Sequence, residues 1–310
     1  MSRMWLRLGV SVAVLAALLY RVGLVEVLEI CLRAQPGLLA CAFLLYVAGQ
    51  VVSALRWWAL ARGVGFSTPL RPCVRIYFVG MFFGLAVPST LGADGARTLY
   101  LGREAPGQTR ALSSVVFDRL VGLVSLVAVA VAALLLGPSG DLPAGLVTAV
   151  VTVGVVLVGA WLLAPPLARL LPDHTRLRRL IEDDLVPYFR DPRLLGAAVG
   201  LSLIVHALQI VTQKILTDAL GLSVPLGFVA IYHPLVVLAT AVPITIGGFG
   251  LREAAYAYLL PHAGIAPDDA VALALLWWAI GALGGLIGGV LYAGDRAART
   301  PRSRSHDEPR

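Results

Sequence analysis

Two arginines, Arg97 and Arg252, each follow a short run of helix-breaking residues within an apolar stretch of the chain. The breakers are Pro88, Gly92 and Gly95 in the first run and Pro243, Gly247, Gly248 and Gly250 in the second. A guanidinium offers a planar fork of donors that fits a phosphate or a carboxylate. We therefore expect both arginines to bind an anionic ligand group, or else to pair with the neighbouring carboxylates Asp94 and Glu253.

A second set of polar side chains follows one face of a helix expected over 194 to 220. Its members, at helical spacing, are Ser202, His206, Gln209, Gln213, Lys214 and Thr217. Such a stripe must face protein or water, so we expect it to line a hydrophilic pathway. The alternative is helix packing, with Lys214 neutralised by Asp218 four residues later. Asp118 and Arg119, early in the segment 112 to 137, are expected to contact the ligand or to form an ion pair at the edge of the apolar layer.

Catalytic signatures are absent from the sequence. It contains no G-x-x-x-x-G-K-[ST] phosphate loop, no H-E-x-x-H zinc motif and no G-x-S-x-G nucleophile turn. The cysteines Cys31, Cys41 and Cys73 have no C-x-x-C spacing and lie in or beside apolar segments. We expect no enzymatic activity, no metal site and no cofactor.

The elements that must position these residues are apolar helices in a membrane. Hydrophobic residues make up 58% of the 310 positions and charged residues 14%, against roughly 25% charged residues in soluble domains. Apolar segments close to the length that crosses a hydrocarbon core of ~30 Å recur along the whole chain. They cover approximately 5 to 25, 37 to 60, 76 to 93, 112 to 137, 143 to 168, 194 to 220, 225 to 246 and 268 to 293.

Arginines in the connecting segments set the expected topology. The loop 169 to 193 and the tail after 295 are both rich in arginine, so both should be cytoplasmic. Eight simple crossings would leave one of them outside. The conflict disappears if 76 to 93 enters and returns from the cytoplasm and 225 to 262 enters and returns from outside. We predict an all-α membrane protein with about six spanning helices, two re-entrant helical hairpins and cytoplasmic termini.

The two runs of breakers form an internal repeat. Residues 87 to 97 and 242 to 252 match at six of eleven positions with a constant offset of 155, and most of the matches are breakers or the arginine. Each half, 37 to 137 and 193 to 293, is then a helix, a hairpin and a helix. With hairpins on opposite faces, this is an inverted-topology repeat, typical of secondary transporters. Backbone groups freed at the breaks must face protein or water, so we expect the breaks to meet near a central cavity.

Three ordered motifs resemble a known family. They are Pro88-x-x-x-Gly92-x-Asp94-x-x-Arg97, Phe117-Asp118-Arg119-x-x-Gly122-Leu123 and Pro243-x-x-x-Gly247-Gly248-x-Gly250-x-Arg252-Glu253. Over most of residues 5 to 293 the chain is similar to the lysylphosphatidylglycerol synthase transmembrane, or flippase-like, family. The resemblance implies a lipid-moving membrane domain over 1–295. The arginine-rich residues that follow, 296–310, are predicted to form a disordered basic cytoplasmic tail. Since only some 17 polar residues follow the last helix, we expect a stand-alone membrane domain and carry over no synthase activity.

Three functions are consistent with these sequence features. The first is a translocator in the bacterial cytoplasmic membrane that moves an anionic, polyprenyl or phospholipid-type lipid between leaflets. The second is an accessory or transferase component in glycolipid or hopanoid modification, and the third is a membrane scaffold. The expected partners are a membrane lipid as substrate and a separate lipid-modifying enzyme, with no nucleic acid.

Overall fold

A computed structural model describes residues 24–86, 90–136, 142–168, 186–241 and 248–299, together with the single positions 170, 172, 178 and 182. All regular secondary structure within these ranges is helical. Most of the predicted first segment, the breakers Pro88, Pro243 and Gly247, and the tail from 300 onward lie outside the described residues. Helix α13 continues to Arg299, four residues into the predicted tail.

The helices at 36–63, 108–136, 144–168 and 192–219 agree with predicted apolar segments to within four residues at each end, whereas the predicted segment 76 to 93 covers the end of one helix and the start of the next. Their bounds are α2 Leu24–Arg33, α3 Pro36–Gly63, α4 Leu70–Ala86, α5 Thr90–Leu101, α6 Gln108–Leu136, α7 Ala144–Ala168, α9 Val186–Arg190, α10 Pro192–Ala219, α11 Leu226–Ala241, α12 Leu251–Leu259, η2 Leu260–Ala263 and α13 Pro267–Arg299.

Four of the described helices are long and apolar enough to cross a membrane: α3, α6, α10 and residues 267–294 of α13. Each has 28 or 29 residues in its apolar span, or about 42 Å of helix, which exceeds a hydrocarbon core of ~30 Å. The start of α10 is fixed by Asp191, whose side chain accepts hydrogen bonds from the backbone N–H groups of Arg193 and Leu194, both at 3.0 Å. The prediction of an all-α membrane protein is confirmed.

The repeat seen in the sequence is also present in the helix boundaries. Adding 155 to the bounds of α3, 36–63, gives 191–218, within one residue of α10 at 192–219. The same shift carries α4, 70–86, onto 225–241, and α11 spans 226–241. Each half therefore has a long helix, a pair of shorter helices and a second long helix.

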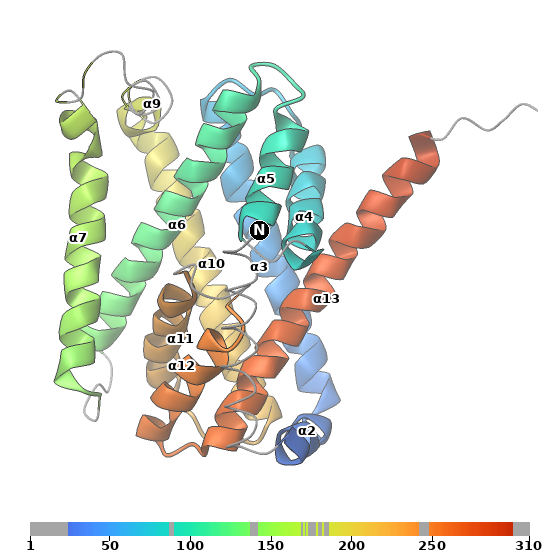
Figure 1. Cartoon of the computed structure of the whole chain (residues 1–310), viewed down its shortest axis with the longest axis vertical. Helices are drawn as coiled ribbons and strands as arrows, with labels where there is room; N and C mark the ends of the chain where they lie inside the picture. The colour runs from blue at the N-terminus through green and yellow to red at the C-terminus, as the bar shows by residue number, and fades with distance from the viewer. Residues whose placement is uncertain are drawn as a thin grey trace, which may run out of the picture.

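The two halves pack closely together, with helices of each half in contact with helices of the other. Helix α3 packs along α10, whereas α4 of the first half packs on α13 and α11 of the second half packs on α6. In Figure 1 the α4–α5 pair lies in the upper half of the molecule and the α11–α12 pair in the lower half, so the two pairs approach the centre from opposite ends. Helix α7 flanks this core and packs on α6.

Small residues of α13 permit its close approach to α4. A Cβ atom at Gly288 would lie 1.8 Å from the carbonyl oxygen of Phe78, and one at Gly285 would lie 2.4 Å from the Leu85 Cδ1 atom. Arg75 also donates a hydrogen bond of 2.8 Å to the carbonyl of Leu291 across the same interface. The Gly-x-x-x-Gly spacing of α13 thus serves helix packing.

We expect Gly288→Ala to lower the thermal unfolding temperature of the purified protein by several degrees. The added methyl group meets backbone rather than a movable side chain, and overpacking typically costs about 1–3 kcal/mol. Gly294→Ala on the same helix is the matched control, because no heavy atom lies within 4 Å of its Cβ position. Equal unfolding temperatures for the two variants would contradict the close contact.

Candidate functional site

A cavity of about 660 Å³ lies where the two halves meet. The first half contributes Tyr46, Gln50, Met81, Gly84 and Leu85, and the second half contributes Gln209, Phe249, Arg252, Trp277, Trp278, Gly281, Ala282 and Leu286. Gly84 and Leu85 end α4 just before the first break, and Phe249 follows the second break. Described residues beside each break therefore line one cavity, which we call the central cavity.

Among the described residues that line this cavity, Arg252 is the one with a charged side chain. Its Nε and Nη2 atoms donate to Glu253 Oε1 at 3.2 and 2.9 Å, and its guanidinium lies 5.3 Å from the Phe249 ring centroid. The Nη1 group has no partner in the described part of the chain. Arg252 thus has a neutralising carboxylate and one donor group, Nη1, that is left for a ligand.

Glu253 is fully buried and has two roles at the second break. While Oε1 accepts from Arg252, Oε2 accepts a hydrogen bond of 2.7 Å from the backbone N–H of Gly250. Gly250 has φ +79° and precedes α12, a conformation that favours glycine. The carboxylate therefore caps α12 and fixes Arg252 at the cavity wall.

The repeat partner of Arg252 has different surroundings. Arg97 is 4% exposed and donates to Asp118 Oδ2 at 2.8 Å. Its guanidinium also lies 4.4 Å from the Trp57 ring centroid and 4.8 Å from that of Tyr77. Arg97 is thus enclosed by aromatic rings, and it does not line the central cavity.

Asp118 is the centre of a buried network that joins both halves. Its Oδ1 accepts from Arg56 Nε at 2.7 Å, and Arg56 Nη1 donates to Ser202 Oγ at 2.8 Å. Asp118 and Arg56 are 2% and 7% exposed, respectively. Arg56 was not among the predicted site residues. A lone arginine in the apolar segment 37 to 60 was the available signal, because an intramembrane charge needs a partner.

Arg119, next to Asp118 in the chain, points elsewhere. Its Nε and Nη2 atoms donate to the carboxylate of Asp94 at 3.1 to 3.2 Å. Asp94 also lies 3.7 Å from Arg97 Nη1, so it connects Arg119 to the buried network. Of the first run of breakers, Gly92 and Gly95 lie in α5 beside Asp94, and Gly248 and Gly250 lie in the turn before α12.

The polar stripe of α10 faces protein, but its members have separate environments. Gln209 lines the central cavity. His206 Nε2 lies 3.1 Å from the carbonyl of Gly122. Gln213 donates to the Tyr256 hydroxyl at 2.6 Å and accepts from the Tyr232 hydroxyl at 3.1 Å. Its two aromatic partners, Tyr232 on α11 and Tyr256 on α12, had no sequence feature that set them apart from core residues.

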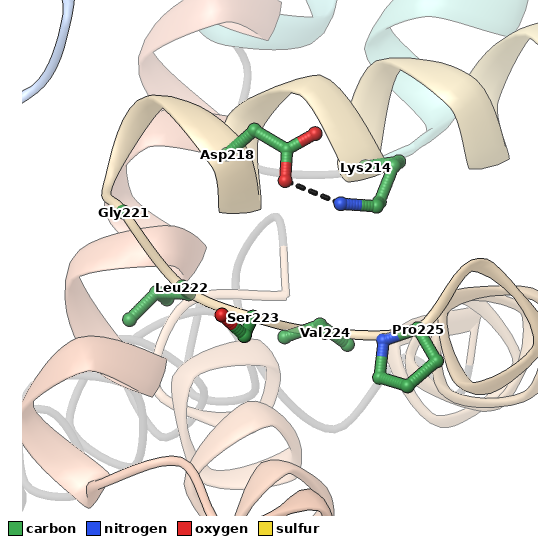
Figure 2. Close-up of a pocket in the computed structure, with 7 residues that line it drawn as sticks. All are labelled: Lys214, Asp218, Gly221, Leu222, Ser223, Val224 and Pro225. Atoms are coloured by element: carbon green, nitrogen blue, oxygen red, sulfur yellow. Dashed lines mark hydrogen bonds and ion pairs between the residues drawn. The ribbon is translucent and has the colours of Figure 1, made fainter.

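Lys214 lines a second cavity, of about 510 Å³, at the end of α10. Figure 2 shows Lys214 paired with Asp218 above the loop from Gly221 to Pro225. This ion pair is 29% and 43% exposed at the two side chains. The two cavities share no lining residue, so the structure separates Lys214 from Arg252.

These features define an all-α, multi-pass membrane protein with a polar site at the junction of two repeated halves. Residues 4–289 match the family model described as "Lysylphosphatidylglycerol synthase TM region". The chain belongs to this family, which confirms the resemblance seen in the three motifs.

Two archaeal proteins are similar to the chain. A UPF0104 membrane protein from Methanothermobacter thermautotrophicus is 21% identical over 309 residues, covering 89% of this chain and 91% of that protein. A UPF0104 membrane protein from Methanocaldococcus jannaschii is 25% identical over 114 residues, or 36% of this chain and 34% of its own length.

Proposed function

We propose that this protein moves an anionic membrane lipid between leaflets and that Arg252 binds the lipid phosphate in the central cavity. The observation that carries the proposal is the position of Arg252 on the wall of a cavity built by both halves. Its guanidinium is a cation with hydrogen-bond donors that the pair with Glu253 does not use. Gln50 and Gln209 add uncharged hydrogen-bonding groups, and Trp277 and Trp278 add apolar surface. A few polar groups within apolar walls suit an amphiphile.

The short helix pairs support an alternating-access mechanism. Helices α4, α11 and α12 have 17, 16 and 9 residues, or about 25, 24 and 13 Å, and are shorter than a hydrocarbon core of ~30 Å. We propose that α4–α5 and α11–α12 are re-entrant hairpins from opposite sides of the bacterial cytoplasmic membrane, with both chain termini cytoplasmic. Rocking of one half against the other would expose the Arg252 site to each side in turn.

Single-cysteine labelling tests this topology. In a background without Cys31, Cys41 and Cys73, we expect a membrane-impermeant maleimide to label Asp268→Cys in intact cells and Gly107→Cys only after permeabilisation. The reason is that the α5–α6 turn and the start of α13 lie at opposite ends of the molecule (Figure 1). Labelling of Gly107→Cys from outside would refute the first re-entrant hairpin.

The cavity itself is tested by Gln209→Leu. We expect this variant to lower the rate of phosphatidylglycerol translocation several-fold in reconstituted vesicles, because it removes a hydrogen-bonding group from the cavity wall and leaves the rest of α10 unchanged. Gln108→Leu is the matched control, since Gln108 is exposed at the start of α6. An unchanged rate in Gln209→Leu would remove the α10 stripe from the lipid pathway.

A further inference from the structure

A charged side chain is exposed on the outer surface of α6, where the surrounding residues are apolar. The Arg119 side chain is 52% exposed and borders a cavity of about 260 Å³ together with Asp94 and five aliphatic residues of α6. Arg119 is the twelfth residue of α6, about 17 Å along the helix from its first residue. An arginine exposed at such depth is costly in hydrocarbon and is a candidate functional group.

The Arg119 guanidinium retains binding capacity. Asp94 occupies the Nε and Nη2 edge, and Nη1 has no partner among the residues that the structure describes. The connected side chains Arg56, Arg97, Arg119, Asp94 and Asp118 comprise three arginines and two aspartates, which leaves one positive charge. Arg119 is the exposed member of this cluster, so an anion would bind there with matching charge.

Apolar residues continue from Arg119 along the same face of α6, from one cavity to a second one. Val116, Leu120 and Leu123 border the charged cavity, and Val127, Val131 and Leu135 line a second cavity of about 590 Å³ between α6 and α7. These positions are spaced by three or four residues and therefore share one helix face. From Leu123 to Leu135 these apolar positions extend about 18 Å along the helix, close to the hydrocarbon thickness of one leaflet, ~15 Å.

We propose that this face of α6 is a binding site for one anionic phospholipid. The lipid phosphate accepts hydrogen bonds from the free edge of Arg119, Asp94 holds the guanidinium in position, and an acyl chain occupies the groove between α6 and α7. The site is separate from the central cavity, with which it shares no lining residue. It does not depend on the proposed translocation, because binding here is measurable without lipid flux.

The contact between Arg119 and the lipid headgroup is tested with the full chain in phosphatidylcholine vesicles. Electron paramagnetic resonance compares how strongly the protein immobilises spin-labelled phosphatidylglycerol and spin-labelled phosphatidylcholine. The wild type should immobilise phosphatidylglycerol preferentially. Arg119→Gln should reduce this preference about tenfold, as expected for one lost charge-assisted hydrogen bond. Arg119→Lys keeps the ion pair with Asp94 and should lose only part of the preference. An unchanged preference in Arg119→Gln would overturn the assignment.

Binding of the acyl chain is tested by a substitution that fills the groove between α6 and α7. Gly159 lines it, and no heavy atom lies within 4 Å of its Cβ position. The side chain of Gly159→Leu should therefore extend into the groove and reduce immobilisation of both lipids. Gly145→Leu is the matched control on α7, because Gly145 is equally unobstructed and lies outside the groove. Equal lipid immobilisation in the two variants, or a change of oligomeric state in Gly159→Leu alone, would show that a lipid chain is not the occupant.

Discussion

Replacing Asp118 by alanine should strongly lower the thermal unfolding temperature of the protein. The change leaves Arg56 and Arg97 buried without their shared carboxylate, which accepts at 2.7 and 2.8 Å. Removing one partner of a buried ion pair costs about 3–5 kcal/mol, a large part of a typical folding free energy of about 5–15 kcal/mol. The measurement is thermal unfolding and monodispersity of the detergent-purified variant.

Two controls distinguish this effect from a general loss of charge. Asp218→Ala removes a partly exposed aspartate from its pair with Lys214, and such exposed pairs contribute only about 0.3–0.5 kcal/mol. The triple variant Asp118→Leu with Arg56→Met and Arg97→Met replaces the buried ions by apolar side chains and should recover much of the stability. If Asp118→Ala and Asp218→Ala unfolded at the same temperature, the network around Asp118 would not be a principal stabilising element.

Arg252→Ala should abolish lipid translocation, and Arg252→Lys, which keeps a cation beside the buried Glu253, should retain a fraction of it. A guanidinium can donate two parallel hydrogen bonds to a phosphate, whereas an ammonium keeps the charge and loses that geometry. Each lost hydrogen bond to a charged group is worth about 1.5–3 kcal/mol. We therefore expect the rate of phosphatidylglycerol translocation in reconstituted vesicles to fall in the order Arg, Lys, Ala.

The alternative role for Arg252 is neutralisation of Glu253. If that were its only role, removing both charges would restore translocation. The suitable double variant is Arg252→Gln with Glu253→Gln, because a glutamine at 253 keeps an oxygen that accepts from the Gly250 N–H. Recovery of translocation in this variant would assign Arg252 to the scaffold, and continued inactivity would assign it to the ligand.

The helix pattern was predictable because it depends on local properties of the sequence. Apolar length sets the spanning helices, as for α3 and α10, and the breakers at equivalent positions set the two shorter pairs. The offset of 155 predicted from residues 87 to 97 and 242 to 252 recurs in helix bounds far from those segments.

The choice of ion-pair partners was not predictable to the same degree, because it depends on how each helix is rotated toward its neighbours. Spacing along the chain favours pairing of Arg97 with Asp94, three residues away. The structure instead gives Arg97 its shorter contact to Asp118, at 2.8 Å, and leaves Asp94 mainly to Arg119. Arg56 and Asp118, 62 residues apart, meet only because α3 packs against α6.

The same limit applies to the two arginines of the repeat. Identical positions in the two halves predict equivalent roles for Arg97 and Arg252. However, the position equivalent to Asp118 is Leu273, and the position equivalent to Glu253 is Thr98. The partners thus differ between the halves, which is why Arg97 is enclosed in the network and Arg252 lines the cavity.

The most direct test of the proposed function is a leaflet-specific assay on vesicles that contain the purified chain and fluorescent phosphatidylglycerol. A membrane-impermeant reductant quenches only label in the outer leaflet. We predict that quenching proceeds beyond the outer-leaflet fraction with the wild type and stops at that fraction with Arg252→Ala. Quenching that stops there with the wild type as well, under conditions where the protein is folded and inserted, would contradict lipid translocation by this protein.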